Sequence, residues 1–277
     1  MAVDTVRGPR RLGRYVILAI VAAIVLLPIY AVLLQALKSG PDAIDHPRSL
    51  LPVDLTFDTI RSAWRIGDLG VLLRNSIIMS VFVTLGVVLT SLLAGYAFAF
   101  LQFPGRRAVF ALYLATLLVP TEVTVVVNQR TIDTFGWKNS YLGLVIPLIA
   151  TGVGTFLVRQ VFLTIPRELR EAASLDGLGN LRFLWEVAAP LSRPTLGALG
   201  LLTFLGTWNQ YLWPQAIIDD TDHRTVQIGL DRLTAADLDN LNLVTAGTVI
   251  AALPIFVMLV AFQRQLVRGL TAGAVKG

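Results

Sequence analysis

The chain contains no cysteine and only two histidines, His46 and His223, among its 277 residues. The absence of cysteine excludes disulfide frameworks, thiolate metal sites and cysteine nucleophiles. Charge is also scarce, because Asp, Glu, Lys and Arg make up 15% of the residues, whereas a soluble domain carries about 25%. The net charge of +5 is not gathered in any block of like charges, so we expect no nucleic-acid partner.

Catalytic and nucleotide-binding motifs are missing as well. The sequence holds no GxxxxGK[ST] phosphate loop, no GxGxxG, no HExxH and no GxSxG. Without a phosphate loop the chain cannot hydrolyse ATP by that route. The alternative of a membrane-embedded transferase or protease has no catalytic residues to support it. We therefore expect a chain with no catalytic residue, no metal site and no cofactor of its own.

Hydrophobic residues make up 55% of the chain, and the mean hydropathy is +0.69. The chain contains six long apolar segments. Of all the charged residues, only Glu122 and Arg159 fall within them. Each segment reaches the roughly 20 residues that a helix needs to cross the hydrocarbon of a bilayer. Buried helices of a soluble core would be shorter and amphipathic. The sequence thus predicts an all-α integral membrane protein with six spans, at about 15–37, 76–100, 108–127, 141–163, 195–218 and 243–262.

The first apolar segment follows three arginines, which is also typical of a signal peptide. It is longer than a signal-peptide core and has no convincing cleavage site after it, so we expect a retained span. With both termini inside, the inner segments and Arg159 hold 14 of the 23 basic residues, as the positive-inside rule requires. We expect a cytoplasmic segment at 1–14, one membrane domain at 15–277 and a location in a bacterial plasma membrane. Arg159 is expected to extend to the cytoplasmic headgroups.

The longest inner segment, 164–190, predicts a helix, a turn and a second helix. Thr164 is a candidate N-cap with Pro166 in the first turn. Gly177 can end the first helix in the left-handed conformation. Asn180 can then cap a second helix that stops at Pro190.

Leu169, Ala172 and Ala173 lie at positions i, i+3 and i+4 of the first helix. They form a narrow face of small side chains, which would let another protein approach the backbone closely. The spacing alone leaves open that this loop lies on lipid headgroups instead.

The sequence Glu171-Ala172-Ala173, then Gly177 and later Pro190-Leu191, resembles the EAA loop of ABC importer permeases. Residues 208–214 and 269–277 resemble carbohydrate-type, MalG-like permeases, and the resemblance runs from about residue 70 to the end. It implies a type I permease fold whose coupling helix docks in a cleft of an ATPase. The residues it implies for ATPase coupling are Glu171, Ala172, Ala173, Asp176 and Gly177.

The same resemblance implies the partners. They are two copies of an ATPase subunit that binds ATP and Mg²⁺, a second related permease, an extracytoplasmic substrate-binding protein and the lipid bilayer. The binding protein would dock on the outer segments 38–75, 128–140 and 219–242.

Asn209-Gln210 after Trp208 stands where many such permeases read Asn-Asp. With residues 118–123 and 139–141, this resembles the E-type permeases of glycerol-3-phosphate and glycerophosphodiester importers. A di- or oligosaccharide is the alternative solute. Polar residues within spans are candidates for the solute route; with the neighbouring tryptophans, which are also candidates for an aromatic belt, they are Glu122, Asn128, Gln129, Arg130, Trp208, Asn209, Gln210 and Trp213.

A remaining alternative is a secondary transporter driven by ions. Such a protein needs intramembrane Asp, Glu or His and paired discontinuous helices. Glu122 is the one acid within the expected spans, which favours the ATP-driven importer.

Overall fold

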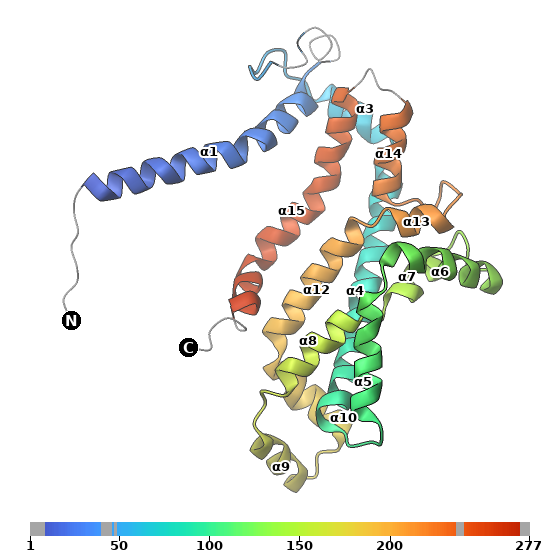
Figure 1. Ribbon diagram of the computed structural model, residues 1–277. Helices are drawn as coiled ribbons and strands as arrows, with labels where there is room; N and C mark the ends of the chain where they lie inside the picture. The colour runs from blue at the N-terminus through green and yellow to red at the C-terminus, as the bar shows by residue number, and fades with distance from the viewer. Residues whose placement is uncertain (1–8, 40–45, 47–48, 237–240, 272–277) are drawn as a thin grey trace. The chain divides into compact units, whose positions relative to one another are not determined.

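The computed structural model describes residues 9–39, 46, 49–236 and 241–271, and this part of the chain is helical without a strand. A single isolated bridge pairs Lys38 with Leu55. The described residues form two compact units. Unit 1 comprises residues 1–69 and 230–252, and unit 2 comprises residues 70–229 and 253–277. Figure 1 labels the helices of both units.

Unit 1 contains α1 (Pro9–Leu37) and α3 (Asp58–Ile66). The side chains of α1 are exposed along most of its length and become buried only near its end, at Leu34 and Ala36. Lys38 follows directly and is completely buried. Its Nζ donates to the carbonyls of His46 (2.7 Å) and Ser49 (3.0 Å), so the ammonium group keeps hydrogen-bond partners inside the protein.

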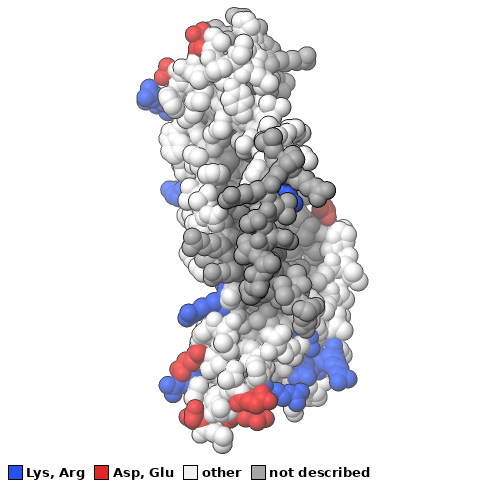
Figure 2. Space-filling view, turned by 90° about the vertical axis from the view of Figure 1, so that its left-hand side faces the viewer, with Lys and Arg blue, Asp and Glu red and all other residues white. Residues whose placement is uncertain are grey.

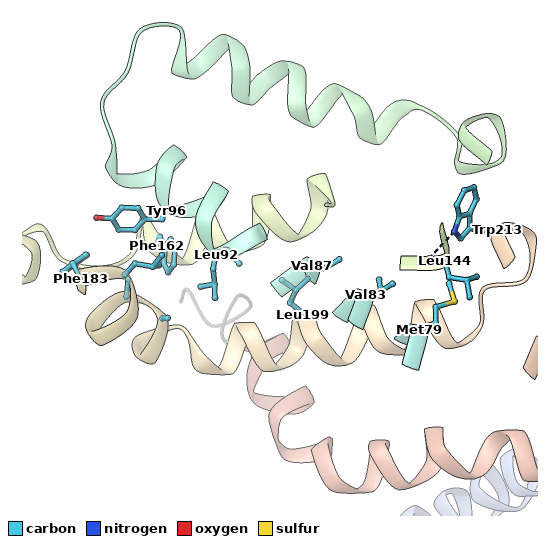
Figure 3. Packing of buried hydrophobic residues seen from close by; sticks show 14 of the residues in the cluster. Met79, Val83, Val87, Leu92, Tyr96, Leu144, Phe162, Phe183, Leu199 and Trp213 are labelled. Atoms are coloured by element: carbon cyan, nitrogen blue, oxygen red, sulfur yellow. Dashed lines mark hydrogen bonds between the residues drawn. The ribbon is translucent and has the colours of Figure 1, made fainter. Parts of the chain in front are cut away.

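Unit 2 is built around α4 (Leu69–Phe100), a helix of 32 residues. Met79, Val83 and Val87 repeat every four residues along it and are buried, since such spacing places side chains on one helical face. Figure 3 shows these residues beside Leu199 of α12 and Leu144 of α7. The other elements of unit 2 are α5 (Arg106–Ala115), η1 (Thr116–Leu118), α6 (Thr121–Phe135), α7 (Tyr141–Val145), η2 (Ile146–Leu148), α8 (Gly152–Phe162), α9 (Arg167–Leu175), α10 (Asn180–Phe183), η3 (Leu184–Ala188), α11 (Ala189–Leu191), α12 (Arg193–Trp208) and α13 (Leu212–Ile217).

Two helices have residues in both units. They are α14 (Val226–Ala236) and α15 (Leu241–Thr271). The carboxyl-terminal resemblance at 269–277 falls mostly outside the described residues, which end at 271.

Three helices of the described chain are long and apolar enough to cross a membrane, at Gly13–Leu37, Leu69–Phe100 and Asn242–Gln263. Two bent pairs raise this number to five if each pair is one span. The count of six spans therefore stays a prediction. Three of the expected spans, at 108–127, 141–163 and 195–218, are interrupted in the structure.

The breaks coincide with polar or proline positions. The chain turns by 102° between Arg106–Leu118 and Thr121–Phe135, since Pro120 has no N–H with which to continue the helix. Tyr141–Leu148 and Gly152–Phe162 meet at 46°. The expected span at 195–218 is interrupted after Trp208, where α12 ends, and α13 begins at Leu212.

α4 and α8 approach closely at Gly95. A Cβ atom added there would lie 2.8 Å from Val158 Cγ1 and 3.1 Å from the backbone nitrogen of Arg159. A Cβ atom added at Gly206 on α12 would have no such neighbour within 4 Å.

We expect Gly95→Ala to destabilise unit 2 by about 1–3 kcal/mol, because the backbones must move apart to admit the methyl group. The measurement is the melting temperature of the purified protein in detergent. Gly206→Ala is the matched control and should leave the melting temperature equal or higher. Equal melting temperatures for both variants would show that α4 and α8 do not pack at Gly95.

Candidate functional site

The segment from α9 to α11, which we call the elbow, lies at one end of unit 2 (Figure 1). The left-handed turn predicted at Gly177 is confirmed, with φ of +78°. Two predicted caps are wrong. Pro166 occupies the N-cap position of α9, and the Thr164 hydroxyl donates to the Val161 carbonyl. Gly179 precedes α10, while Asn180 Oδ1 accepts a hydrogen bond of 3.1 Å from the Tyr96 hydroxyl.

The second helix of the elbow ends at Leu191, next to its predicted end at Pro190. A π-helical turn at Leu184–Ala188 leads directly into Ala189–Leu191. Ser192 then separates it from α12.

The face predicted from Leu169, Ala172 and Ala173 is not a single exposed surface. Ala173 is buried in the core of unit 2, and its carbonyl accepts a hydrogen bond from the Leu178 backbone N–H (2.9 Å). Ala173 therefore fastens α9 to this chain, and the prediction that it lies open to a partner is wrong. The exposed residues of the elbow include Glu168, Leu169, Glu171, Ala172, Leu175, Asp176 and Gly177.

Three arginines converge on the carboxyl end of α4. Arg159 Nε donates to the Phe98 carbonyl (3.3 Å). Arg170 Nη1 donates to the Phe100 carbonyl (2.6 Å), and Arg106 Nη1 donates to Leu101 (2.7 Å). The last carbonyls of a helix have no partner within it, and a cation there also interacts favourably with the helix dipole.

The same contacts place Arg159 beside two other helices. Its guanidinium lies 4.3 Å from the centre of the Phe110 ring of α5, and its extension to the headgroups stays a prediction. Arg170 similarly lies over the Phe100 ring at 5.4 Å. Sequence reasoning missed both roles, because each arginine is more than sixty residues away from the carbonyl it binds.

An aromatic cluster surrounds the same end of α4. Phe100 packs against Phe162 of α8 at 5.8 Å and edge-on against Phe183 of α10 at 5.6 Å. Tyr96 contacts Phe100 at 5.2 Å. The elbow, α8 and α4 are thus joined by rings as well as by arginines.

A second polar cluster, which we call the outer clasp, holds the segment between α13 and α14. Asn75 of α4 is fully buried. Its Nδ2 donates to the carbonyls of Asp222 (2.7 Å) and Arg224 (2.9 Å), and its Oδ1 accepts from the Tyr141 hydroxyl (2.6 Å). Ser76 Oγ accepts from the backbone N–H of Val226 (2.8 Å).

Asn139 adds a further tie to this segment. Its Oδ1 accepts from the backbone N–H groups of Asp219 (2.7 Å) and Asp220 (3.3 Å). Desolvation opposes ionisation of Asp220, but hydrogen bonds from the His223 side chain and backbone outweigh it and hold the pKa of Asp220 below its ordinary value. A lowered pKa in the folded state stabilises the segment at neutral pH, and this stabilisation is lost as the pH falls through that pKa.

The predicted route residues of α6 differ in environment. Glu122 is exposed in the first turn of α6, where its charge is favoured by the helix dipole. Gln129 Nε2 donates to the Ala216 carbonyl (2.9 Å) and ties α6 to α13. Asn128 is half-buried and Arg130 is exposed.

The predicted route residues around the end of α12 separate into two groups. Trp208 is 1% exposed and stacks on Phe204 at 5.8 Å. Trp213 is also buried, and its Nε1 donates to the Leu144 carbonyl at 3.3 Å (dashed in Figure 3). Both tryptophans therefore pack within this chain. Asn209 and Gln210 remain at the break, exposed and half-buried respectively.

The helices and the arrangement of their charges define a multi-pass membrane protein, and comparison with known proteins gives its family. Residues 86–272 match the family described as "Binding-protein-dependent transport system inner membrane component". The chain therefore belongs to this family, and it is an ABC importer permease of the carbohydrate type.

Two relatives carry the same name, sn-glycerol-3-phosphate transport system permease protein UgpE. The chain is 34% identical to that of Yersinia pestis bv. Antiqua (strain Antiqua) over 264 residues, which cover 92% of this chain and 94% of the relative. It is 35% identical to that of Salmonella typhi over 257 residues, which cover 90% and 91%. Its fold is similar to a chain in the crystal structure of a bacterial ABC transporter involved in the import of the acidic polysaccharide alginate, with a TM-score of 0.81, 23% identity and coverage of 95% and 99%.

We expect Asn75→Leu to loosen the outer clasp, because it leaves two carbonyls and the Tyr141 hydroxyl without their partner. Losing such buried hydrogen bonds costs about 1–3 kcal/mol. Amide hydrogen exchange over residues 219–226 should become at least tenfold faster. Tyr141→Phe removes only one of the three bonds and should give a smaller increase. Unchanged exchange in Asn75→Leu would contradict the clasp.

Proposed function

We propose that this chain is a permease subunit of an ATP-driven importer for glycerol-3-phosphate or glycerophosphodiesters. A soluble binding protein delivers the solute to the outer face, a second related permease completes the channel, and two ATPase subunits bind ATP and Mg²⁺. The chain itself catalyses no reaction. The observation that carries the proposal is the elbow, which exposes a short helix on a segment firmly bonded to the longest helix of unit 2.

The proposed mechanism is mechanical coupling. Closure of the ATPase subunits on ATP moves α9, and the Arg170 bond to the Phe100 carbonyl passes this motion to α4. Ala173 keeps α9 attached during the movement because it is buried in the same core. The helices then rock between inward-open and outward-open states as packed bodies. Glu171, Ala172 and Asp176 are the exposed contacts for the ATPase, and Gly177 sets the turn.

The solute proposal rests on the relatives and on the break after α12. Relatives at 34–35% identity are named for sn-glycerol-3-phosphate transport. Asn209 and Gln210 place neutral amides at this break. A neutral residue at 210 also leaves the route free of a negative charge that would repel an anionic phosphate ester. A di- or oligosaccharide is the second candidate, because neutral amides also bind hydroxyl groups.

Transport by the complete importer in proteoliposomes tests the function directly. We expect uptake of glycerol-3-phosphate to require ATP on the cytoplasmic side and to continue in the presence of an ion uncoupler. Uptake that needs the ion gradient and not ATP would establish a secondary transporter instead. Binding of glycerophosphodiesters and of disaccharides to the cognate binding protein separates the two solute classes.

We expect Gly177→Val to uncouple ATP hydrolysis from transport or to release the ATPase subunits. A β-branched residue is strained at φ of +78°, so the turn and the exposed contacts of α9 shift. Gly179→Ala is the matched control, because Gly179 has φ of −73° and no atom within 4 Å of an added Cβ. The measurements are ATPase retention on membranes and the ratio of solute imported to ATP hydrolysed. Full coupling in Gly177→Val would argue against docking at the elbow.

A further inference from the structure

Two cavities flank the turn between α4 and α5 in unit 2. The first has a volume of about 360 Å³, and its polar wall consists of Gln102, Arg106, Arg167, Arg170 and Glu171. The second has about 440 Å³ and lies over the start of α5. Gln102 and Arg106 line both cavities, and Arg107 lines the second. Lys and Arg atoms also gather over this lower end of unit 2, beside Asp and Glu atoms, on the face shown in Figure 2.

The arginines of these walls keep unused hydrogen-bond donors. Arg106 and Arg170 each give one nitrogen to a carbonyl at the end of α4, and a guanidinium has five N–H donors. No side-chain hydrogen bond or ion pair joins Arg107 or Arg167 to another residue of the described part of the chain. Glu171 is the only acid on either wall. Four cations around one acid leave the site positively charged.

The surface beside the cavities is apolar. Leu112 on α5 is 73% exposed, and Phe103, Val109 and Leu163 are also exposed. The chain thus passes from Arg107 to an exposed apolar helical face within one turn. Charged groups followed directly by an exposed apolar face are what a lipid requires, because its charged headgroup is joined to apolar acyl chains.

We propose that these cavities bind the phosphate of an anionic phospholipid headgroup, with the acyl chains lying along α5. Arg106 and Arg107 contact the phosphate from the start of α5, and Arg167 and Arg170 contact it from α9. Arginine suits this role because its planar guanidinium binds phosphate in a bidentate manner. The bound lipid would connect α9 to the turn after α4 and so stabilise the elbow.

An acidic segment of a partner protein has the charge to fit the same arginines. The exposed Leu112, Val109 and Leu163 favour the lipid, because a phospholipid supplies apolar chains directly beside its charged group. The proposal uses the membrane location of the chain and does not depend on which solute is imported.

The test compares lipid retention by the complete transporter, titrated with phosphatidylglycerol or phosphatidylcholine and examined by native mass spectrometry. The Arg107→Gln, Arg167→Gln double variant should bind phosphatidylglycerol at least tenfold more weakly at one site, with phosphatidylcholine unchanged. Arg193→Gln is the control, because Arg193 is exposed near the elbow and lines neither cavity. Millimolar inorganic phosphate should not displace the lipid.

A second measurement uses the unaltered protein and so does not depend on folding of a variant. A phosphatidylglycerol carrying a photoreactive group near its headgroup should crosslink to residues 102–112 or 163–171. Equal retention in all variants, with no crosslink there, overturns the proposal. Displacement by inorganic phosphate shows a free-phosphate site instead, and loss of the ATPase from the double variant with lipid retention unchanged shows a protein interface.

Discussion

The carboxyl end of α4 imposes the constraint on which the rest of unit 2 depends. The last carbonyls of a helix have no partner within it, so each needs a donor from elsewhere. Here the donors come from Arg106 of α5, Arg159 of α8 and Arg170 of α9. The bonds that complete α4 are therefore the same bonds that attach three other helices to it. Arg170 thus connects α9 directly to the last turn of α4.

The helices of unit 2 divide into one long helix and several broken ones. α4 runs for 32 residues without interruption, while the chain breaks at Pro120, between Leu148 and Gly152, and after Trp208. Backbone groups freed at a break need partners, and local side chains supply some of them. Before Gly152, Thr151 Oγ1 accepts from the Gly154 N–H (3.0 Å). Near the end of α13, the more distant Gln129 of α6 donates to the Ala216 carbonyl. The breaks thus place polar groups within otherwise apolar stretches of the chain.

The distribution of charge along the sequence was enough to predict helices in a membrane and an elbow outside it. The turn at Gly177 could be predicted because only glycine adopts φ of +78° without strain. Burial of Ala173 could not be predicted, since helical spacing gives a face but not its neighbour. The role of Arg159 was missed for the same reason, because its partner lies 61 residues away. Pro120 and Asn209 mark the positions of two breaks in the sequence. A proline or polar residue can either bend a span or end it, however, and the packing of the other helices decides which of the two occurs.

Arginine, and not lysine, supplies the positive charge at this end of unit 2. Every basic residue in 101–107 and in 164–194 is an arginine. A lysine is a compact, strongly hydrated charge, whereas a guanidinium presents a rigid fork of donors. Arg106 and Arg170 can therefore donate inward to α4 and still offer N–H groups to a phosphate. A count of basic residues treats them only as a topology signal, but the guanidinium geometry lets one side chain bind a helix end and still present N–H donors to a ligand.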